Sequence, residues 1–304
     1  MARYIVLYLL MTGVCFTACE KKIDMTLPSY QDKLVVEGSI ENGEVPMVLL
    51  TKSIPYFSTI DFQTLANEIL INDAKVKVVA GDGEEEVLQM SPHADSPLFV
   101  AYTGKTLKGK CNMTYRLEIE WNSKKYTATT FIPNTFTLDS LWLNPVGNPA
   151  DSNATVRVLM NDNANEQNYY RFFVKVKGKL LHDRLWVYTL PLVFDDIPFN
   201  GLTFNYEIMR GIPSTLYASA LSDEEKKEYY RASFKPGDTI DIKYSQIDYT
   251  TFRFWSTAMS ELTFGQNIFM SPAPIEGNVQ SEQGEQVLGA WCGYAATRKT
   301  IIYQ

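Results

Sequence analysis

The clearest chemical role in the sequence belongs to Cys19, because the segment before it has the pattern of a bacterial lipoprotein signal. One cation, Arg3, is followed by an apolar run over residues 4–16 and by two small residues directly before the cysteine. A secretory signal needs a positive start, a short apolar stretch and small residues at its cleavage site. We therefore predict that residues 1–18 are removed and that the Cys19 thiol carries the lipid.

Lipidation would make residues 19–32 a short charged tether between a membrane and the rest of the chain. The alternative is an uncleaved anchor, but the apolar run is shorter than the roughly 20 residues that a spanning helix needs. More than one acyl chain holds a protein firmly on a bilayer, whereas a single chain binds only marginally. We therefore expect a lipid-anchored protein of the cell envelope, and the sequence leaves the membrane face open.

Two acidic clusters have residue types that serve catalysis or metal binding. Asp195 and Asp196 form an adjacent carboxylate pair, for which a turn at a strand end is the favoured interpretation. The segment 161–166 is rich in the oxygen ligands that calcium prefers. It lacks the glycine and the spaced final glutamate of an EF-hand loop, so we expect a polar turn. The sequence thus predicts no metal, no cofactor and no catalytic residue.

The common catalytic and metal-binding sequence motifs do not occur in this sequence. His93 and His182 are the two histidines, and neither has a metal-binding neighbour at helical or strand spacing. The zinc-binding H-E-x-x-H pattern, the G-x-S-x-G nucleophile elbow and the phosphate-binding glycine loops do not occur. We therefore do not expect an enzyme, and a glycan or peptide hydrolase with unrecognised carboxylates is the least favoured alternative.

Two cysteines remain once Cys15 is removed with the signal and Cys19 is acylated. They are Cys111 and Cys292, which lie far apart in the sequence. An oxidising envelope permits a disulfide, but two buried free thiols are the favoured interpretation, and the pairing stays open.

Trp121 is the aromatic residue that we single out as a candidate for ligand contact, because it lies at the tip of a predicted hairpin. The other tryptophans are expected to be buried in apolar surroundings; they are Trp142, Trp186, Trp255 and Trp291.

A nucleic-acid partner is not expected, because the net charge is −7 and the cations are scattered among acids.

Alternating apolar and polar residues dominate the chain from residue 33 onward, as in antiparallel strands with one buried face. Tight hairpins are predicted at Gly81-Asp82-Gly83 and at Asn122-Ser123. The strands of residues 33–133 indicate an immunoglobulin-like or transthyretin-like β-sandwich. Pro133-Asn134 marks the expected domain boundary.

Residues 134–304 are predicted to form a second β-rich domain that contains two helices. Ser222 and Glu225 have the spacing of a capping box, which opens a helix over about 222–232. Asp248 can cap a second helix over 249–262, whose aromatic stripe is expected to pack in the core. The strands expected here cover 155–160, 169–176, 185–194, 204–210 and 239–245.

A series of short motifs runs along nearly the whole mature chain in a defined order. They are Cys19–Asp24, Leu34–Gly38, Leu50–Ser53, Tyr126–Thr130, Leu138–Ser140, Asn168–Phe172, Phe252–Trp255, Asn267–Phe269 and Gly277–Val279. In this order the motifs resemble a family of Bacteroidetes lipoproteins, the domain of unknown function DUF4249. The resemblance implies an outer-membrane lipoprotein that is often encoded beside a TonB-dependent transporter, and it implies no catalytic residue.

The leading functional expectation is a non-enzymatic accessory lipoprotein that binds a nutrient, such as a glycan or peptide, or docks onto a TonB-dependent barrel. The alternative from another class is a structural or adhesive surface protein, in which the sandwich spaces the second domain from the membrane.

Overall fold

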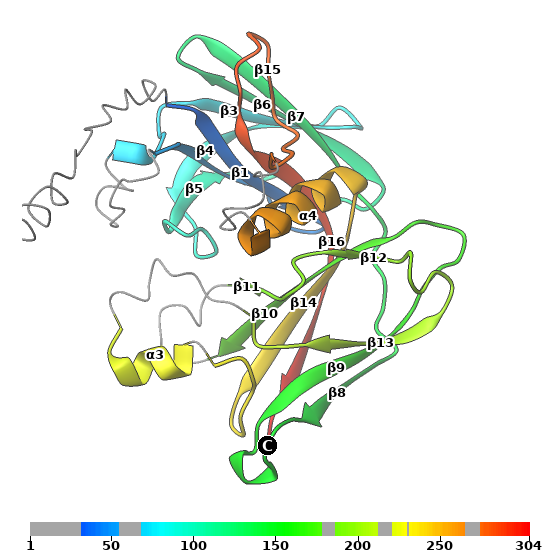
Figure 1. Cartoon of the computed structure of the whole chain (residues 1–304). Helices are drawn as coiled ribbons and strands as arrows, with labels where there is room; N and C mark the ends of the chain where they lie inside the picture. Colours follow the sequence, from blue (N-terminus) through cyan, green and yellow to red (C-terminus); the bar gives the residue numbers. More distant parts are fainter. Residues whose placement is uncertain (1–31, 55–67, 178–185, 212–220, 230, 265–273) are drawn as a thin grey trace, which may run out of the picture. The chain divides into compact units, whose positions relative to one another are not determined.

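The computed structural model describes residues 32–54, 68–177, 186–211, 221–229, 231–264 and 274–304 (Figure 1). Cys19, the signal and the tether up to residue 31 lie outside the described residues, as does His182. Residues Asp32–Gln304 form one compact unit. Its elements, in chain order, are β1 (Leu34–Glu41), β2 (Met47–Lys52), β3 (Lys75–Ala80), β4 (Glu85–Pro92), β5 (Val100–Thr103), β6 (Met113–Trp121), β7 (Lys124–Ile132), β8 (Ser140–Pro145), the 3₁₀ turn η3 (Pro149–Asp151), β9 (Ala154–Asn161), β10 (Tyr169–Lys177), β11 (Val187–Tyr188), β12 (Phe194–Asp195), β13 (Thr203–Ile208), α3 (Asp223–Tyr229), β14 (Thr239–Ile247), α4 (Tyr249–Phe264), β15 (Gln280–Ser281) and β16 (Leu288–Ile302).

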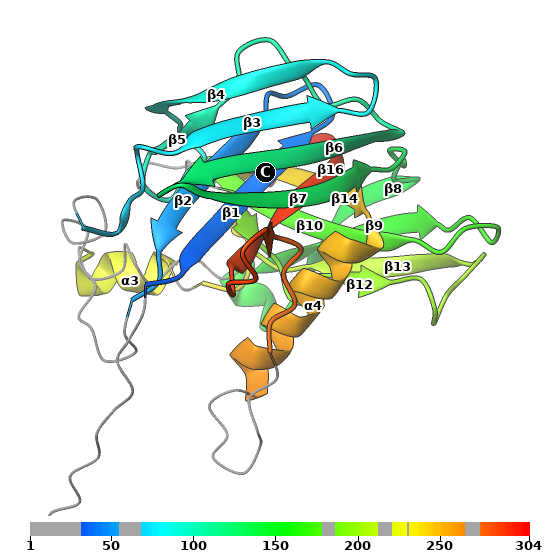
Figure 2. The same cartoon turned by 90° about the horizontal axis from the view of Figure 1, so that it is seen from above.

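The expected mainly β fold is confirmed, with one large sheet and one small sheet among the described residues. The large sheet runs in the order β11-β10-β14-β16-β1-β2-β5-β4-β3-β6-β7-β15, and β12 also pairs with β10. β4 pairs with β3 through its first half and with β5 through its second half, so the sheet folds over on itself. Figure 2 shows the resulting layers, with β3, β6 and β7 above β1 and β2.

The first hydrophobic core fills the space between these layers. Strand alternation turns Leu34, Val36 and Ile40 of β1 inward, and Trp291 of β16 is fully buried among them. Both predicted hairpins are confirmed: Gly83 has a φ of 92°, and Asn122 and Ser123 also have positive φ. Positive φ at the turn suits the twist of the paired strands.

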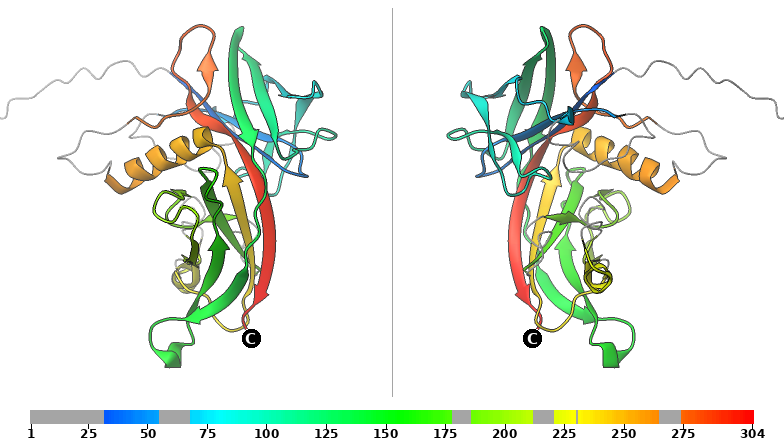
Figure 3. Two further views of the ribbon diagram at one scale, coloured as in Figure 1. Left: turned by 90° about the vertical axis from the view of Figure 1, so that its right-hand side faces the viewer. Right: turned by 90° about the vertical axis from the view of Figure 1, so that its left-hand side faces the viewer.

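Strand β16 pairs with a strand from the N-terminal part of the chain and with one from the C-terminal part. Leu288 to Tyr294 pair in parallel with β1, and Tyr294 to Ile302 pair antiparallel with β14. Figure 3 shows this long strand running from the sandwich to the C-terminal end. We did not predict β16 from the sequence, because residues 290–296 are buried on both faces and therefore lack alternation.

The small sheet, in the order β13-β9-β8, covers one face of β10 and β14. The second hydrophobic core lies between them and includes Phe172, Tyr244 and Val158. One predicted strand is wrong: instead of a strand over 185–194, the described part of this segment forms the two-residue strands β11 and β12. Pro191 lies between them and lacks the N–H that a continuous ladder needs.

Both predicted helices are present in the structure. Ser222 and Glu225 bond reciprocally before α3: the Ser222 hydroxyl accepts from the Glu225 N–H at 3.3 Å, and the Glu225 carboxylate accepts from the Ser222 N–H at 2.8 Å. At α4 the Asp248 carboxylate accepts from the Thr251 N–H at 2.7 Å, as an N-cap does. Its other oxygen accepts from the Phe131 N–H at 2.8 Å and so ties α4 to β7. No helix within the described ranges is long and apolar enough to cross a membrane.

Candidate ligand-binding cavity

A cavity of about 680 Å³ lies on the face of the large sheet that is formed by β1, β16, β14 and β10, beside α4. It is built by strand alternation, since the neighbours of the core residues on each strand point the other way. Thus Glu37 of β1, Arg171 of β10 and Tyr294 of β16 line the cavity, while Ile40 and Phe172 pack in the two cores behind it.

Aromatic rings form much of the cavity wall. They come from β10, β11, α4, β16 and the residue before β11, and they are Phe173, Tyr188, Phe254, Trp255, Tyr294 and Trp186. Small-molecule sites are concave, have mainly apolar and aromatic walls, and hold a few placed polar groups. The volume and the wall of this cavity match that description.

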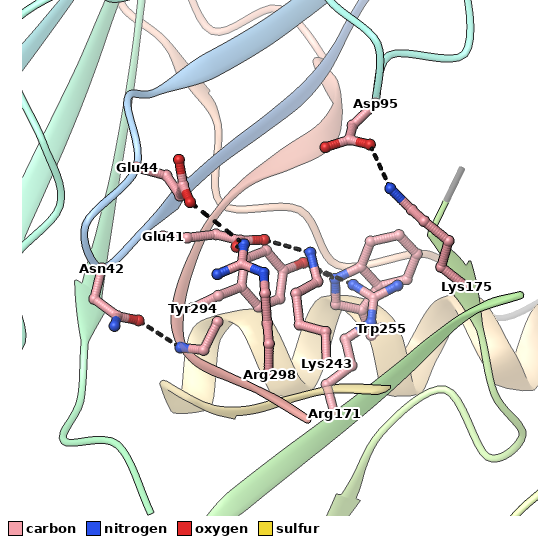
Figure 4. A network of polar contacts seen from close by, with 11 residues as sticks. Glu41, Asn42, Glu44, Asp95, Arg171, Lys175, Lys243, Trp255, Tyr294 and Arg298 are labelled. Carbon is pink, nitrogen blue, oxygen red and sulfur yellow. Dashed lines mark hydrogen bonds and ion pairs between the residues drawn. The ribbon is translucent and has the colours of Figure 1, made fainter. Parts of the chain in front are cut away.

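A network of ion pairs crosses one end of the cavity (Figure 4). Glu41 of β1 accepts from buried Lys243 of β14 and, at 2.6 Å, from Arg298 of β16. Arg298 also lies 3.7 Å from Glu44. These contacts join three strands through their side chains, and each of the four charged groups has an opposite partner.

Arg171 is held differently, by aromatic residues rather than by a carboxylate. It is 2% exposed, and its guanidinium lies 3.5 Å from the ring centroid of Trp255 and 4.6 Å from that of Phe173. Nη1 donates to the Tyr294 hydroxyl at 2.7 Å, and the Trp255 indole N–H donates to the same hydroxyl at 3.1 Å (Figure 4). Arg171 Nε has no hydrogen-bond partner among the described residues. The cation is therefore fixed in position without a counter-charge in contact.

Glu37 of β1, on the same face of the sheet, is the anion of the cavity without an ion-pair partner. Its side chain is open to the cavity, and among the described residues no group forms an ion pair with it. Protein surrounds the carboxyl closely enough that burial raises its pKa, while the charge of Arg171 acts to lower that pKa. The two groups thus influence each other across the cavity without forming an ion pair.

Cys292 also lines the cavity, but its environment makes it a poor nucleophile. Burial raises the pKa of its thiol to about 11, so the protonated form dominates at neutral pH. Both Cys111 and Cys292 are free, as favoured, and Cys111 is half-buried rather than buried.

The acidic candidates from the sequence lie away from this cavity and have structural roles. The Asp196 carboxylate accepts from the Asn168 N–H at 2.7 Å in the turn region near β12. Asp162, in the segment 161–166, accepts from the Tyr170 hydroxyl at 2.6 Å and from the Gly201 N–H at 2.9 Å. These bonds are those of turns and strand ends, as expected.

The tryptophan predictions have mixed outcomes. Trp121 is half-buried against the first core, its indole N–H donates to Asp73 at 3.1 Å, and its role as a ligand contact stays a prediction. The predicted burial is confirmed for Trp291. The prediction is wrong for Trp142, which is 37% exposed. Trp186 and Trp255 are half-buried because one side of each faces the cavity.

The residues of the cavity were not predicted from the sequence, although β10 carries a detectable signal. Its sequence YYRFFVKV is apolar on both faces, which indicates a strand covered on both sides. A charge at Arg171 in such a strand must be buried, and a buried charge needs a partner. On β1, by contrast, Glu37 has the alternation of an ordinary solvent-facing residue.

The fold and the cavity define a mainly β protein with a charged, aromatic recess on one face of its large sheet. The family model described as Domain of unknown function (DUF4249) matches residues 20–300, which is most of the chain. The chain therefore belongs to this family, as its motifs predicted. No curated protein matches the sequence.

Proposed function

We propose that this chain is a lipid-anchored binding protein of the bacterial outer membrane, as in Bacteroidetes, which binds a small nutrient in the cavity. It would act as an accessory to a TonB-dependent transporter and present its ligand to the barrel. The signal pattern before Cys19 and the family resemblance support the location and the partner. The cavity supports the binding role.

The observation that carries the proposal is the pair of cavity charges without contacting partners, Arg171 and Glu37, in an aromatic recess of about 680 Å³. Arg171 is 2% exposed, and a buried charge costs free energy unless it is paired. Polar groups with perturbed pKa values gather where a protein binds or reacts. A ligand that supplied the missing partners would recover this cost on binding.

The first experiment is a mild-detergent pulldown of the tagged full-length protein from its native membrane, with Cys19→Ala as the control for lipidation. We expect a TonB-dependent barrel to co-elute with the lipidated protein and to be depleted with the variant. Recovery of the lipidated protein without a barrel would contradict the accessory role and would favour the structural or adhesive alternative.

The same preparation tests the cavity separately. Heating the purified protein should release a bound small molecule that mass spectrometry detects. Ser39→Phe, which places a ring in the cavity from β1, should abolish this release, whereas Ser260→Phe on the exposed side of α4 should not. Equal release from both variants would place the bound molecule elsewhere.

A further inference from the structure

The charges of the cavity fall into two groups, and the difference between them indicates the chemistry of the ligand. In the first group, every cation has a carboxylate within ion-pair distance. Lys243 and Arg298 contact Glu41, and Lys175 lies 3.3 Å from Asp95, which lines the cavity (Figure 4). These charges are satisfied by the protein itself.

The second group consists of Glu37 and Arg171, which lie on different strands and have opposite signs. Arg171 acts electrostatically on Glu37, but their side chains are farther apart than the 4.0 Å of an ion pair. If the protein needed only internal neutralisation, direct contact would be the more stable arrangement. Both side chains line the same cavity, which therefore holds one anion and one cation without an ion-pair partner.

Arg171 is also prepared to bind an anion. A guanidinium has five N–H donors, and the structure gives it one hydrogen bond, to Tyr294. Stacking on Trp255 and the bond to Tyr294 fix the orientation of the planar group, so an anion that reaches its free donors from the cavity meets a cation already held in place. Glu37 offers the complementary acceptor for an ammonium group.

The geometry points to a zwitterionic ligand of the short-peptide type, with its ammonium group at Glu37, its carboxylate at Arg171 and apolar side chains against the aromatic wall. This inference rests on the proposed binding function and names its ligand class. The volume of about 680 Å³ lies in the range of sites for small molecules of this size. Phe173, Phe254 and Trp186 provide the apolar surface.

The test is calorimetric titration of the full-length detergent-solubilised protein with three matched probes. They are the dipeptide leucyl-phenylalanine, its N-acetyl form, which lacks the ammonium group, and its C-terminal amide, which lacks the carboxylate. We expect the free dipeptide to bind at least about tenfold more tightly than either blocked form, because each blocked form leaves one cavity charge unpaired.

Glu37→Gln separates a specific contact from general attraction. This substitution should lower the affinity for the free dipeptide by about tenfold and leave the affinity for the N-acetyl form unchanged. Glu120→Gln, an exposed change on β6, is the matched control and should alter neither affinity. The probe with the blocked carboxylate tests the Arg171 contact without a protein variant, so a misfolded Arg171 variant cannot obscure the result.

Equal binding of the free and blocked dipeptides, or no binding by any of them, would overturn the zwitterion inference. The binding function would still stand if heated native protein released a different small molecule that Ser39→Phe abolishes. It would fail only if no molecule were released and no barrel co-eluted.

Discussion

At the scale of single residues, the charged groups of the cavity differ in whether the protein itself supplies an ion-pair partner. Lys243, Arg298 and Glu41 form a network that the protein completes by itself, whereas Arg171 relies on aromatic faces and one hydroxyl. Contacts of a cation with aromatic rings are favourable, more so when desolvated, but they do not neutralise the charge. Glu37 and Arg171 therefore have no ion-pair partner among the described residues.

Replacing Glu37 should stabilise the ligand-free protein at neutral pH. Burial raises the pKa of Glu37 above its ordinary 4.5, so the folded state holds this proton more tightly than the unfolded chain. The free energy of unfolding then falls as pH rises through the folded pKa, because the carboxyl must ionise in surroundings that solvate it poorly. The side chain is exposed to the cavity, so the gain is small: we expect Glu37→Gln to melt about 1 °C higher near neutral pH, with the difference vanishing in acid below the ordinary pKa.

Thermal melts across this pH range check the prediction, with the exposed change Glu120→Gln as the control. A melting difference that stayed constant with pH, or that grew toward acid, would mean that the Glu37 carboxyl is not destabilised by burial.

Tyr294 should be the most costly hydroxyl of the site to remove. It is buried and accepts from both Arg171 and Trp255, so Tyr294→Phe leaves two donors without an acceptor and should cost about 2–4 kcal/mol. Tyr303→Phe is the matched control, because its hydroxyl makes one exposed bond to the Ser152 carbonyl at 2.9 Å and should cost less than about 1 kcal/mol. Urea unfolding measures both, and similar losses would contradict the central role of the Tyr294 hydroxyl.

At the scale of elements, β16 and its close neighbours position the cavity. Strand β16 brings Tyr294 and Cys292 to the cavity face and Trp291 to the first core. Its parallel pairing with β1 places Glu37 opposite Ala290 in the register. The start of this strand depends on Gly289, which has a φ of 90°.

Gly289→Ala should disrupt the β1–β16 pairing. A Cβ at this position would lie 2.0 Å from the Val36 carbonyl oxygen, so the backbone must move, and the left-handed φ adds strain. We expect a loss of about 3 kcal/mol or more, or failure to fold. Gly284→Ala has a similar φ of 78° but open space around the new methyl group, and should cost about 1 kcal/mol. Equal effects in chemical denaturation would show that the close approach to Val36 is unimportant.

At the scale of the whole molecule, the last strand, β16, completes the first hydrophobic core. The first hydrophobic core includes Trp291 and Ala295 from the C-terminal end together with residues of β1 to β7. Thr130 of β7 accepts from the Gly293 N–H at 2.7 Å, and the Trp291 indole N–H donates to the Tyr115 carbonyl at 3.0 Å. The expected sandwich of residues 33–133 therefore uses a strand from residues 288–294.

The fragment 33–133 should be unable to form a stable domain by itself. Without β16 it would leave β1 as an unpaired edge and a cavity where Trp291 packs, and loss of a buried Trp alone costs about 3–5 kcal/mol. Circular dichroism and hydrogen exchange of the fragment should show little protected structure. A cooperatively folded fragment would contradict this prediction and would support an independent first domain.

The sequence by itself determined the local features of this protein. The hairpins at residues 81–83 and 122–123 and the caps at Ser222 and Asp248 were predictable, because each depends on residues within a few positions of one another. The mainly β fold followed from alternation, and the family followed from the order of the motifs.

Only the tertiary structure decided the cavity and the strand that organises it. Residues 290–296 of β16 are covered on both faces, so they carry no alternation, and its partners β1 and β14 lie far away in the sequence. Glu37 and Arg171 are separated by more than a hundred residues, and alternation alone cannot distinguish a solvent-facing position from a cavity-facing one. The physical reason is that a site made of non-local strand pairings exists only after the sheet has formed.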